Sequence, residues 1–251
     1  QKFKRILSQL ALRTDNLPSN GTLRNKLELA QLELDWQFGS QQLLKNNQEK
    51  IKQIAADTQA SNFALANALL VAFHAESDPE TAIQHVTVIA NNQEMLRQCE
   101  QLLEVSPAGV TAIQNLQTVR LALISTVLGL PEIQQPDKAE LKDTWKLKQA
   151  SVLIALKQNQ QALHALAELE KKYPKNAEIQ MQLARSLTGA LEESNPKIPL
   201  EKWRHIATRL KKNTPNWYEA KYQVARLLFK SGDREAAAKL LKSIKAIPPG
   251  W

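Results

Sequence analysis

The sequence predicts an all-α protein, and three observations support this fold class. Only 7 of its 251 residues are glycine and 5% are aromatic, whereas large β-sandwiches and barrels need frequent turn residues and aromatic or β-branched strands. Leu, Ala, Gln, Lys and Glu dominate instead, and each of them favours helices. Apolar residues recur at the three- and four-residue spacing of an amphipathic helix, and no useful length of strand-like alternation interrupts them.

Short turns divide the first half of the chain into consecutive expected helices. Apolar stripes that begin at Phe3 and at Leu23 predict the first two. Asp78 is a candidate N-cap, with Pro79 at the first helical position, where proline is tolerated. The other expected helices of this half cover about 41–58, 61–75 with Ser61 as its cap, 92–105 and 108–128.

The clearest internal repeat is the segment from Tyr218 to Trp251, which is 34 residues long. The positions that define its hairpin are a small residue on each helix, a turn and a closing proline: Ala225, Ala237, Gly232-Asp233 and Pro249. Glycine permits the tight turn, small side chains let the two helices approach closely, and proline ends the second helix. The segment resembles the tetratricopeptide (TPR) family and the terminal repeat of large bacterial repeat proteins.

Two further units precede this segment and match the TPR pattern less strictly. In the first, small residues and a closing proline stand near the expected positions (Ala150, Ala162, Pro174), but the turn glycine is missing and the turn near Asn159 is expected to be shortened. In the second, helices are expected at 177–191 and about 200–213, with a long connection between them.

The resemblance therefore predicts a TPR-like α-α superhelix, or α-solenoid, of stacked antiparallel hairpins. Residues 143–251 would hold the recognisable repeats (143–176, 177–215 and 218–251). Residues 1–142 would form a degenerate helical-hairpin array continuous with them. Because the chain opens on Gln1 rather than Met, we expect it to be a fragment of a larger protein.

The formal charge of +8 is unevenly distributed along the chain. Residues 1–125 carry 11 Lys and Arg against 12 Asp and Glu, whereas residues 126–251 carry 22 against 13. An acidic protein, a nucleic acid or an anionic membrane surface could use this basic half. Solubility alone would also explain it.

Residues that could support catalysis are sparse. The single Cys99 excludes an intramolecular disulfide, and the sequence has no glycine-rich phosphate loop, serine elbow or paired-carboxylate motif. None of the four histidines has a metal-ligand spacing: His74, His85, His164 and His205. The sequence therefore predicts a protein that is not an enzyme and has no cofactor or metal site. The sequence contains no run of about 18 apolar residues, so it predicts no transmembrane segment.

The resemblance also implies where a partner would bind. In the TPR family the first helices of successive repeats line an inner groove, and the residue after the small mid-helix position points into it. Those residues here are Ser151, Arg185 and Arg226. The nearby positions Lys148, Tyr222 and Lys230 complete the candidate peptide-binding set.

Two interpretations of the arginines remain open. They could offer forked donors to the carboxylates of an extended acidic peptide or a chain terminus. Alternatively, both could pair with neighbouring Glu or Asp residues of the same array.

Three functions follow from the sequence. The leading one is a non-enzymatic protein–protein interaction scaffold that binds an extended, acidic peptide in the groove. The first alternative is an accessory or regulatory domain of a larger multidomain enzyme or secretion assembly. The second is nucleic-acid binding through the basic half, centred on one helix with Lys202, Arg204, His205, Arg209, Lys211 and Lys212, although its Trp203 is expected to be buried.

Overall fold

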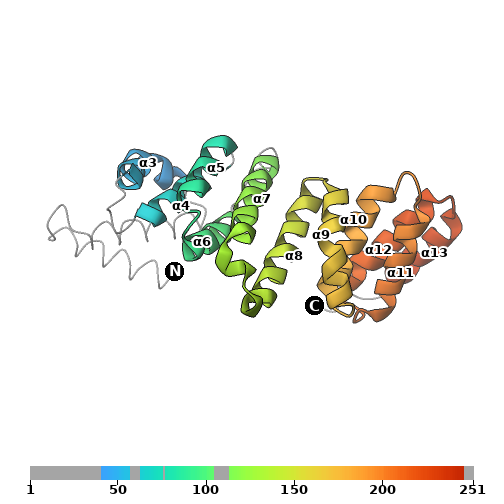
Figure 1. Cartoon of the computed structure of the whole chain (residues 1–251). Coiled ribbons are helices and arrows are strands. Elements are labelled where there is room, and N and C mark those ends of the chain that lie inside the picture. The colour runs from blue at the N-terminus through green and yellow to red at the C-terminus, as the bar shows by residue number, and fades with distance from the viewer. Residues whose placement is uncertain (1–40, 57–62, 76, 105–112, 246–251) are drawn as a thin grey trace. The chain divides into compact units, whose positions relative to one another are not determined.

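The computed structural model describes residues 41–56, 63–75, 77–104 and 113–245. Every regular element within these ranges is a helix, so the predicted all-α fold class is confirmed for them (Figure 1). The helices expected to start at Phe3 and Leu23, the cap at Ser61 and the closing Pro249 lie outside the described residues. The chain divides into two compact units, Gln1–Lys142 and Asp143–Trp251.

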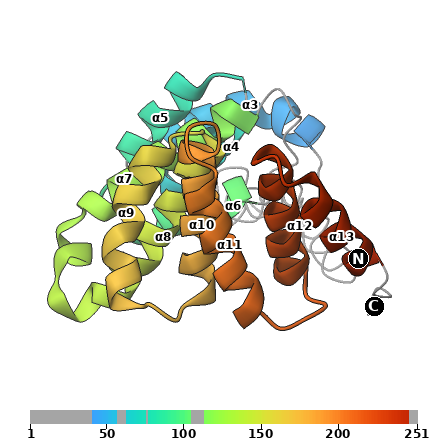
Figure 2. The same cartoon turned by 90° about the vertical axis from the view of Figure 1, so that its right-hand side faces the viewer.

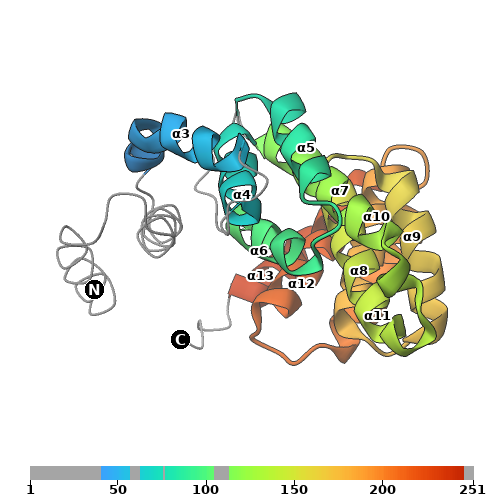
Figure 3. The same cartoon turned by 60° about the vertical axis from the view of Figure 1, so that its left-hand side comes forward.

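The described part of the N-terminal unit consists of helices that pack mainly on their neighbours in the chain. Its elements are α3 (Gln41–Ala56), α4 (Phe63–His74), α5 (Pro79–Val88), α6 (Gln93–Glu104), α7 (Ile113–Gly129) and the short 3₁₀ helices η1 (Pro131–Gln134) and η2 (Pro136–Lys138). Helix α4 contacts α3, α5 and α6, and α7 contacts α5 and α6. Figure 3 shows α4 beside α3, α5 and α6.

Helix α4 is apolar on nearly all sides, and three helices cover it. Its described residues after Ala66 are almost all buried, and Asn67 among them is only 1% exposed. Asn67 Oδ1 lies 2.8 Å from His85 Nδ1 on α5, which satisfies the buried amide. The predicted start of α5 is confirmed, since the Asp78 side chain accepts a hydrogen bond from the Thr81 amide and Pro79 opens the helix.

The C-terminal unit is a stack of helical hairpins. Its helices are α8 (Ala139–Ala155, which starts before the unit boundary), α9 (Asn159–Lys172), α10 (Ala177–Leu191), α11 (Lys197–Arg209), α12 (Pro215–Lys230) and α13 (Arg234–Lys245). Each helix from α9 to α13 packs on the next one along the chain. The connections are short, so neighbouring helices run antiparallel (Figure 2).

Small residues lie at the closest approaches of these helices. Ala150 and Ala162 are fully buried in the α8–α9 hairpin, and Ala225 and Ala237 are 2% and 3% exposed in the α12–α13 hairpin. Ala184 of α10 is also fully buried. These are the positions that the TPR pattern predicts, so the described hairpins of the C-terminal unit form a TPR-like α-solenoid.

Two apolar clusters hold the hairpins together. The first joins Ala150 of α8 with residues of α9 and α10 (Leu166, Leu169, Ile179, Leu183). The second joins Met181 and Ala184 of α10 with residues of α11, α12 and α13, around the fully buried Trp203. The indole nitrogen of Trp203 donates to Thr188 Oγ1 at 2.8 Å, which satisfies the one polar atom of that side chain.

The boundaries of one helix differ from the sequence prediction. Helix α11 covers Lys197–Arg209 rather than about 200–213, because Pro199 is accommodated in its first turn, where its missing N–H is not needed. Helix α12 starts at Pro215, and the Thr214 hydroxyl caps it by accepting a hydrogen bond from the Trp217 amide.

The turn of the α8–α9 hairpin is not shortened, contrary to expectation. Lys157 lies in the left-handed region with φ 60°, as Gly232 does with φ 91° in the α12–α13 turn. The amides that follow them make equivalent bonds to the preceding helix, Gln158 to the Leu153 carbonyl and Asp233 to the Leu228 carbonyl. A lysine therefore occupies the conformation that favours glycine.

Candidate functional site

The predicted site residues lie on the first helices of the three hairpins of the C-terminal unit. Lys148 is on α8, Arg185 is on α10, and the other three are on α12: Tyr222, Arg226 and Lys230. We call the side of α8, α10 and α12 that carries Ser151, Arg185 and Arg226 the first-helix surface.

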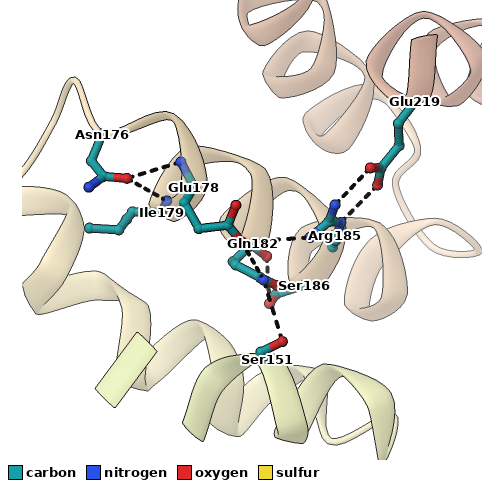
Figure 4. Close-up of polar contacts among 8 residues, drawn as sticks. All are labelled: Ser151, Asn176, Glu178, Ile179, Gln182, Arg185, Ser186 and Glu219. Carbon is teal, nitrogen blue, oxygen red and sulfur yellow. Dashed lines mark hydrogen bonds and ion pairs between the residues drawn. The ribbon is translucent and has the colours of Figure 1, made fainter. Parts of the chain in front are cut away.

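Arg185 makes a forked ion pair with the next first helix. Its Nε donates to Glu219 Oε1 at 2.8 Å, and its Nη2 donates to Glu219 Oε2 at 2.7 Å (Figure 4). A second carboxylate, that of Glu178, lies 4.0 Å away. The hydrogen bond to Glu219 is the main reason why the pKa of Arg185 is raised further above its ordinary value.

Arg226 and Lys230 pair backward, with the connection that leaves α10. Both contact the carboxylate of Glu192, and Lys230 Nζ also lies 2.6 Å from Glu193 Oε1. The pKa of Glu193 is lowered chiefly by its hydrogen bond from Lys230. The Nε of Arg226 is buried and has no hydrogen-bond partner within the described residues.

A chain of polar side chains connects α8, α10 and α12 (Figure 4). Gln182 Nε2 donates to Glu178 Oε1 at 2.7 Å and reaches Ser151 Oγ at 3.5 Å. Glu178 and Glu219 flank Arg185. Since Arg185 and Glu219 are 34 residues apart, about one repeat, these contacts join successive first helices.

The structure thus realises the second interpretation of the arginines. Arg185 and Arg226 both pair with glutamates of the same array. Each still keeps about a third of its side chain exposed, 31% and 35% respectively. Their guanidinium groups are therefore held in place from within the chain while one side faces solvent.

Lys148 and Tyr222 lie outside this polar chain. Lys148 Nζ is 5.7 Å from the ring centroid of Trp145 on the same helix. The Tyr222 side chain is 55% exposed.

A longer sequence signal marks the pairing partners, and the reasoning from small residues missed it. The segments PKNAEIQMQLAR (174–185) and PNWYEAKYQVAR (215–226) share Pro, Glu, Gln, Ala and Arg at the same five positions. The Arg of the first motif pairs with the Glu of the second. Aligning the two segments could have identified Glu219 as the partner of Arg185.

Helix α11 has few features of a nucleic-acid surface. Trp203, its one Trp, Tyr or Phe residue, is buried as expected, and Lys202 is paired with Glu170 at 2.7 Å. Lys211 and Lys212 lie beyond the end of the helix at Arg209 rather than on it. Stacking on single-stranded nucleic acid uses exposed rings beside basic groups, and on α11 the imidazole of His205 is the one exposed ring.

The described residues hold neither a metal site nor a membrane span. Within them, no group of three or more His, Cys, Asp and Glu side chains is placed to hold a metal ion. No helix in the same part of the chain is both long and apolar enough to cross a membrane.

Comparison of the sequence with protein-family models gives no match, and comparison with curated proteins gives none either. A solved structure with a similar arrangement is that of the nearly identical TPR-like repeats described for a kinesin light chain of Podosopora anserina. The sequence identity is 15%, the alignment covers 81% of this chain and 93% of the other, and the TM-score is 0.39. The assignment of TPR-like hairpins rests on their geometry and not on this similarity.

Proposed function

We propose that this chain is a non-enzymatic protein-interaction scaffold, whose C-terminal unit binds an extended acidic peptide along the first-helix surface. In this proposal 143–176, 177–215 and 218–251 are the repeat units. Arg185, Arg226 and Lys230 are the anchors, and Lys148 and Tyr222 lie at the margins of the site. The observation that carries the proposal is the recurrence of a partly exposed, fixed arginine at the same motif position of two successive first helices.

The internal glutamates do not preclude this function. A guanidinium has five N–H donors in a planar fork, and one carboxylate uses two of them. Glu219 therefore leaves donors of Arg185 for a second carboxylate while it fixes the side chain. A fixed side chain loses less conformational entropy when a ligand binds.

Charge favours an acidic ligand over a neutral one. Residues 143–251 carry 20 Lys and Arg against 10 Asp and Glu. An excess of positive charge accelerates the encounter with an anionic chain, and salt weakens the effect.

The test compares two arginine substitutions of equal charge. Arg185→Gln removes a proposed anchor, whereas Arg204→Gln removes an exposed arginine of α11 that is outside the first-helix surface. Affinity for a fluorescent, flexible Glu-rich peptide is measured by anisotropy at two salt concentrations. We expect Arg185→Gln to weaken binding at least about tenfold, as for loss of one charge-assisted hydrogen-bonded pair, and Arg204→Gln to leave it nearly unchanged.

Equal affinities of the two variants would contradict the proposed anchor. Binding that does not weaken with salt would contradict the proposed charge recognition. Circular dichroism of both variants checks that the helices remain folded.

A further inference from the structure

The last hairpin of the C-terminal unit exposes apolar side chains at positions that are covered in the earlier hairpins. Tyr222 and Phe229 of α12 are 55% and 57% exposed, and Leu241 of α13 is 48% exposed. Figure 2 shows α12 and α13 as the last pair of helices in this unit. We call these three side chains and Arg226 the end face.

The equivalent residues of the α8–α9 hairpin show what covers such a face. The matching turns at Lys157 and Gly232 align the two hairpins, so that Leu166 corresponds to Leu241 and Leu147 to Tyr222. Leu166 is fully buried in a cluster with Ile179 and Leu183 of α10, and Leu147 packs against that cluster. The next first helix therefore covers this position in the α8–α9 hairpin.

The α10–α11 hairpin repeats the arrangement. Met181 occupies the motif position of Tyr222 and is fully buried in a cluster with Ala220 and Val224 of α12. Tyr222 itself is exposed because no described helix takes the place of α12 beside it. The contact between a hairpin and the next first helix thus occurs twice in this unit, and the end face offers the same kind of surface for a third such helix.

The incoming helices share a chemical signature. In α10 and α12, a glutamate is followed directly by an aliphatic residue and, one helical turn later, by another: Glu178, Ile179, Leu183 and Glu219, Ala220, Val224. Glu219 pairs with Arg185 of the preceding motif. At the end face the corresponding arginine is Arg226, which pairs with Glu192 of the preceding connection and whose Nε has no hydrogen-bond partner within the described residues.

We propose that the end face docks an amphipathic helix of a partner protein, one that carries a glutamate for Arg226 followed by aliphatic residues for Tyr222, Phe229 and Leu241. The end face is apolar between basic groups, and an exposed apolar patch with a polar rim is typical of an interaction site. Arg234 lies 5.4 Å from the Phe229 ring, and Lys230 follows Phe229 on the helix. These charges favour an acidic helix and oppose pairing of the end face with a second copy of itself.

The docked helix and the peptide of the proposed function would share Arg226 and Tyr222, but each has a residue of its own. Leu241 of α13 belongs only to the end face, and Arg185 of α10 belongs only to the first-helix surface. Variants of these two residues therefore let the two proposals fail separately.

The experiment uses the full chain and a labelled helical peptide. The peptide repeats the apolar face of α12, with its glutamate followed by alanine, valine and leucine at the α12 spacing, and has glutamates on the opposite face. Its affinity is measured by anisotropy for the parent protein, for Leu241→Ser and for Ile198→Ser. Ile198 is the matched control, because it is an apolar residue of α11 that is also exposed, at 44%.

We expect Leu241→Ser to weaken binding at least about tenfold, a loss of about 1.4 kcal/mol, and Ile198→Ser and Arg185→Gln to leave it unchanged. A second peptide has lysine in place of its first glutamate. It should bind weakly to the parent protein and more tightly to the Arg226→Glu variant. Equal binding to Leu241→Ser, or no binding at about 1 mM peptide, would overturn the proposal. Sedimentation that shows a dimer of the parent and a monomer of Leu241→Ser would overturn it in favour of a second copy.

Discussion

At the scale of single residues, the two equivalent turns of the C-terminal unit differ in how well the residue suits its backbone. Gly232 and Lys157 both have positive φ, but only glycine adopts that conformation without a steric cost to Cβ. A Cβ at Gly232 would meet no atom within 4 Å, so any cost of substitution there comes from the backbone and not from a clash.

We predict opposite effects of substitution in the two turns. Gly232→Ala should lower the free energy of unfolding by about 1 kcal/mol, and Lys157→Gly should raise it by up to about 1 kcal/mol. Thermal unfolding followed by circular dichroism measures both changes. Gly129→Ala is the control, because Gly129 ends α7 with no left-handed φ and has open space at its Cβ. A loss of stability in Lys157→Gly would contradict the explanation.

At the scale of elements, α4 and α5 of the N-terminal unit bring two histidines together. The rings of His74 and His85 stack with their centroids 6.1 Å apart, and His85 is bonded to buried Asn67. Burial is the main cause that lowers the pKa of both histidines. For His74, nearby Asp78 opposes this effect and Lys52 adds to it; for His85, the charge of His74 adds to it.

These lowered pKa values predict a loss of stability in acid. In the unfolded chain the histidines take up protons near the ordinary pKa of about 6.5, before they do so in the folded protein. Stability should therefore be full above about pH 6.5 and should fall as the pH drops toward the lowered pKa values. Calorimetric unfolding at about pH 7.5 and pH 5.5 measures the fall.

Substitution of His85 tests whether this histidine causes the pH dependence of stability. His85→Gln should reduce the difference in stability between the two pH values, whereas His205→Gln, at an exposed position of α11, should not. An unchanged difference in His85→Gln would show that other groups cause it.

The sequence was sufficient to predict helix starts and helix contacts where a cap or a small residue marks them locally. Asp78 before Pro79 predicted the start of α5, and the small residues Ala150, Ala184 and Ala225 predicted where helices meet. The start of α11 could not be read locally, because a proline is compatible both with a connection and with a first helical turn. The turn at Lys157 was expected to be shortened because it lacks the glycine that its backbone conformation favours.

At the scale of the whole molecule, the positions of the two arginines could be predicted from the sequence, whereas their surroundings could not. Recurrence after a small residue located Arg185 and Arg226 on first helices. Their partners could not be derived from that pattern, because Glu219 and Glu192 come from neighbouring hairpins whose register depends on packing across the unit. The result is a basic surface that already holds its own carboxylates.

The most direct test of the interaction scaffold is therefore to remove those carboxylates and leave the arginines in place. We predict that the combined Glu219→Gln and Glu192→Gln variant binds the flexible Glu-rich peptide more tightly than the parent, by about tenfold. Removal of two carboxylates that compete with the peptide outweighs the conformational entropy that fixation of Arg185 and Arg226 saves. Isothermal titration of parent and variant at one salt concentration measures this change. Unchanged or weaker binding by a variant that keeps its helical circular dichroism would contradict the account.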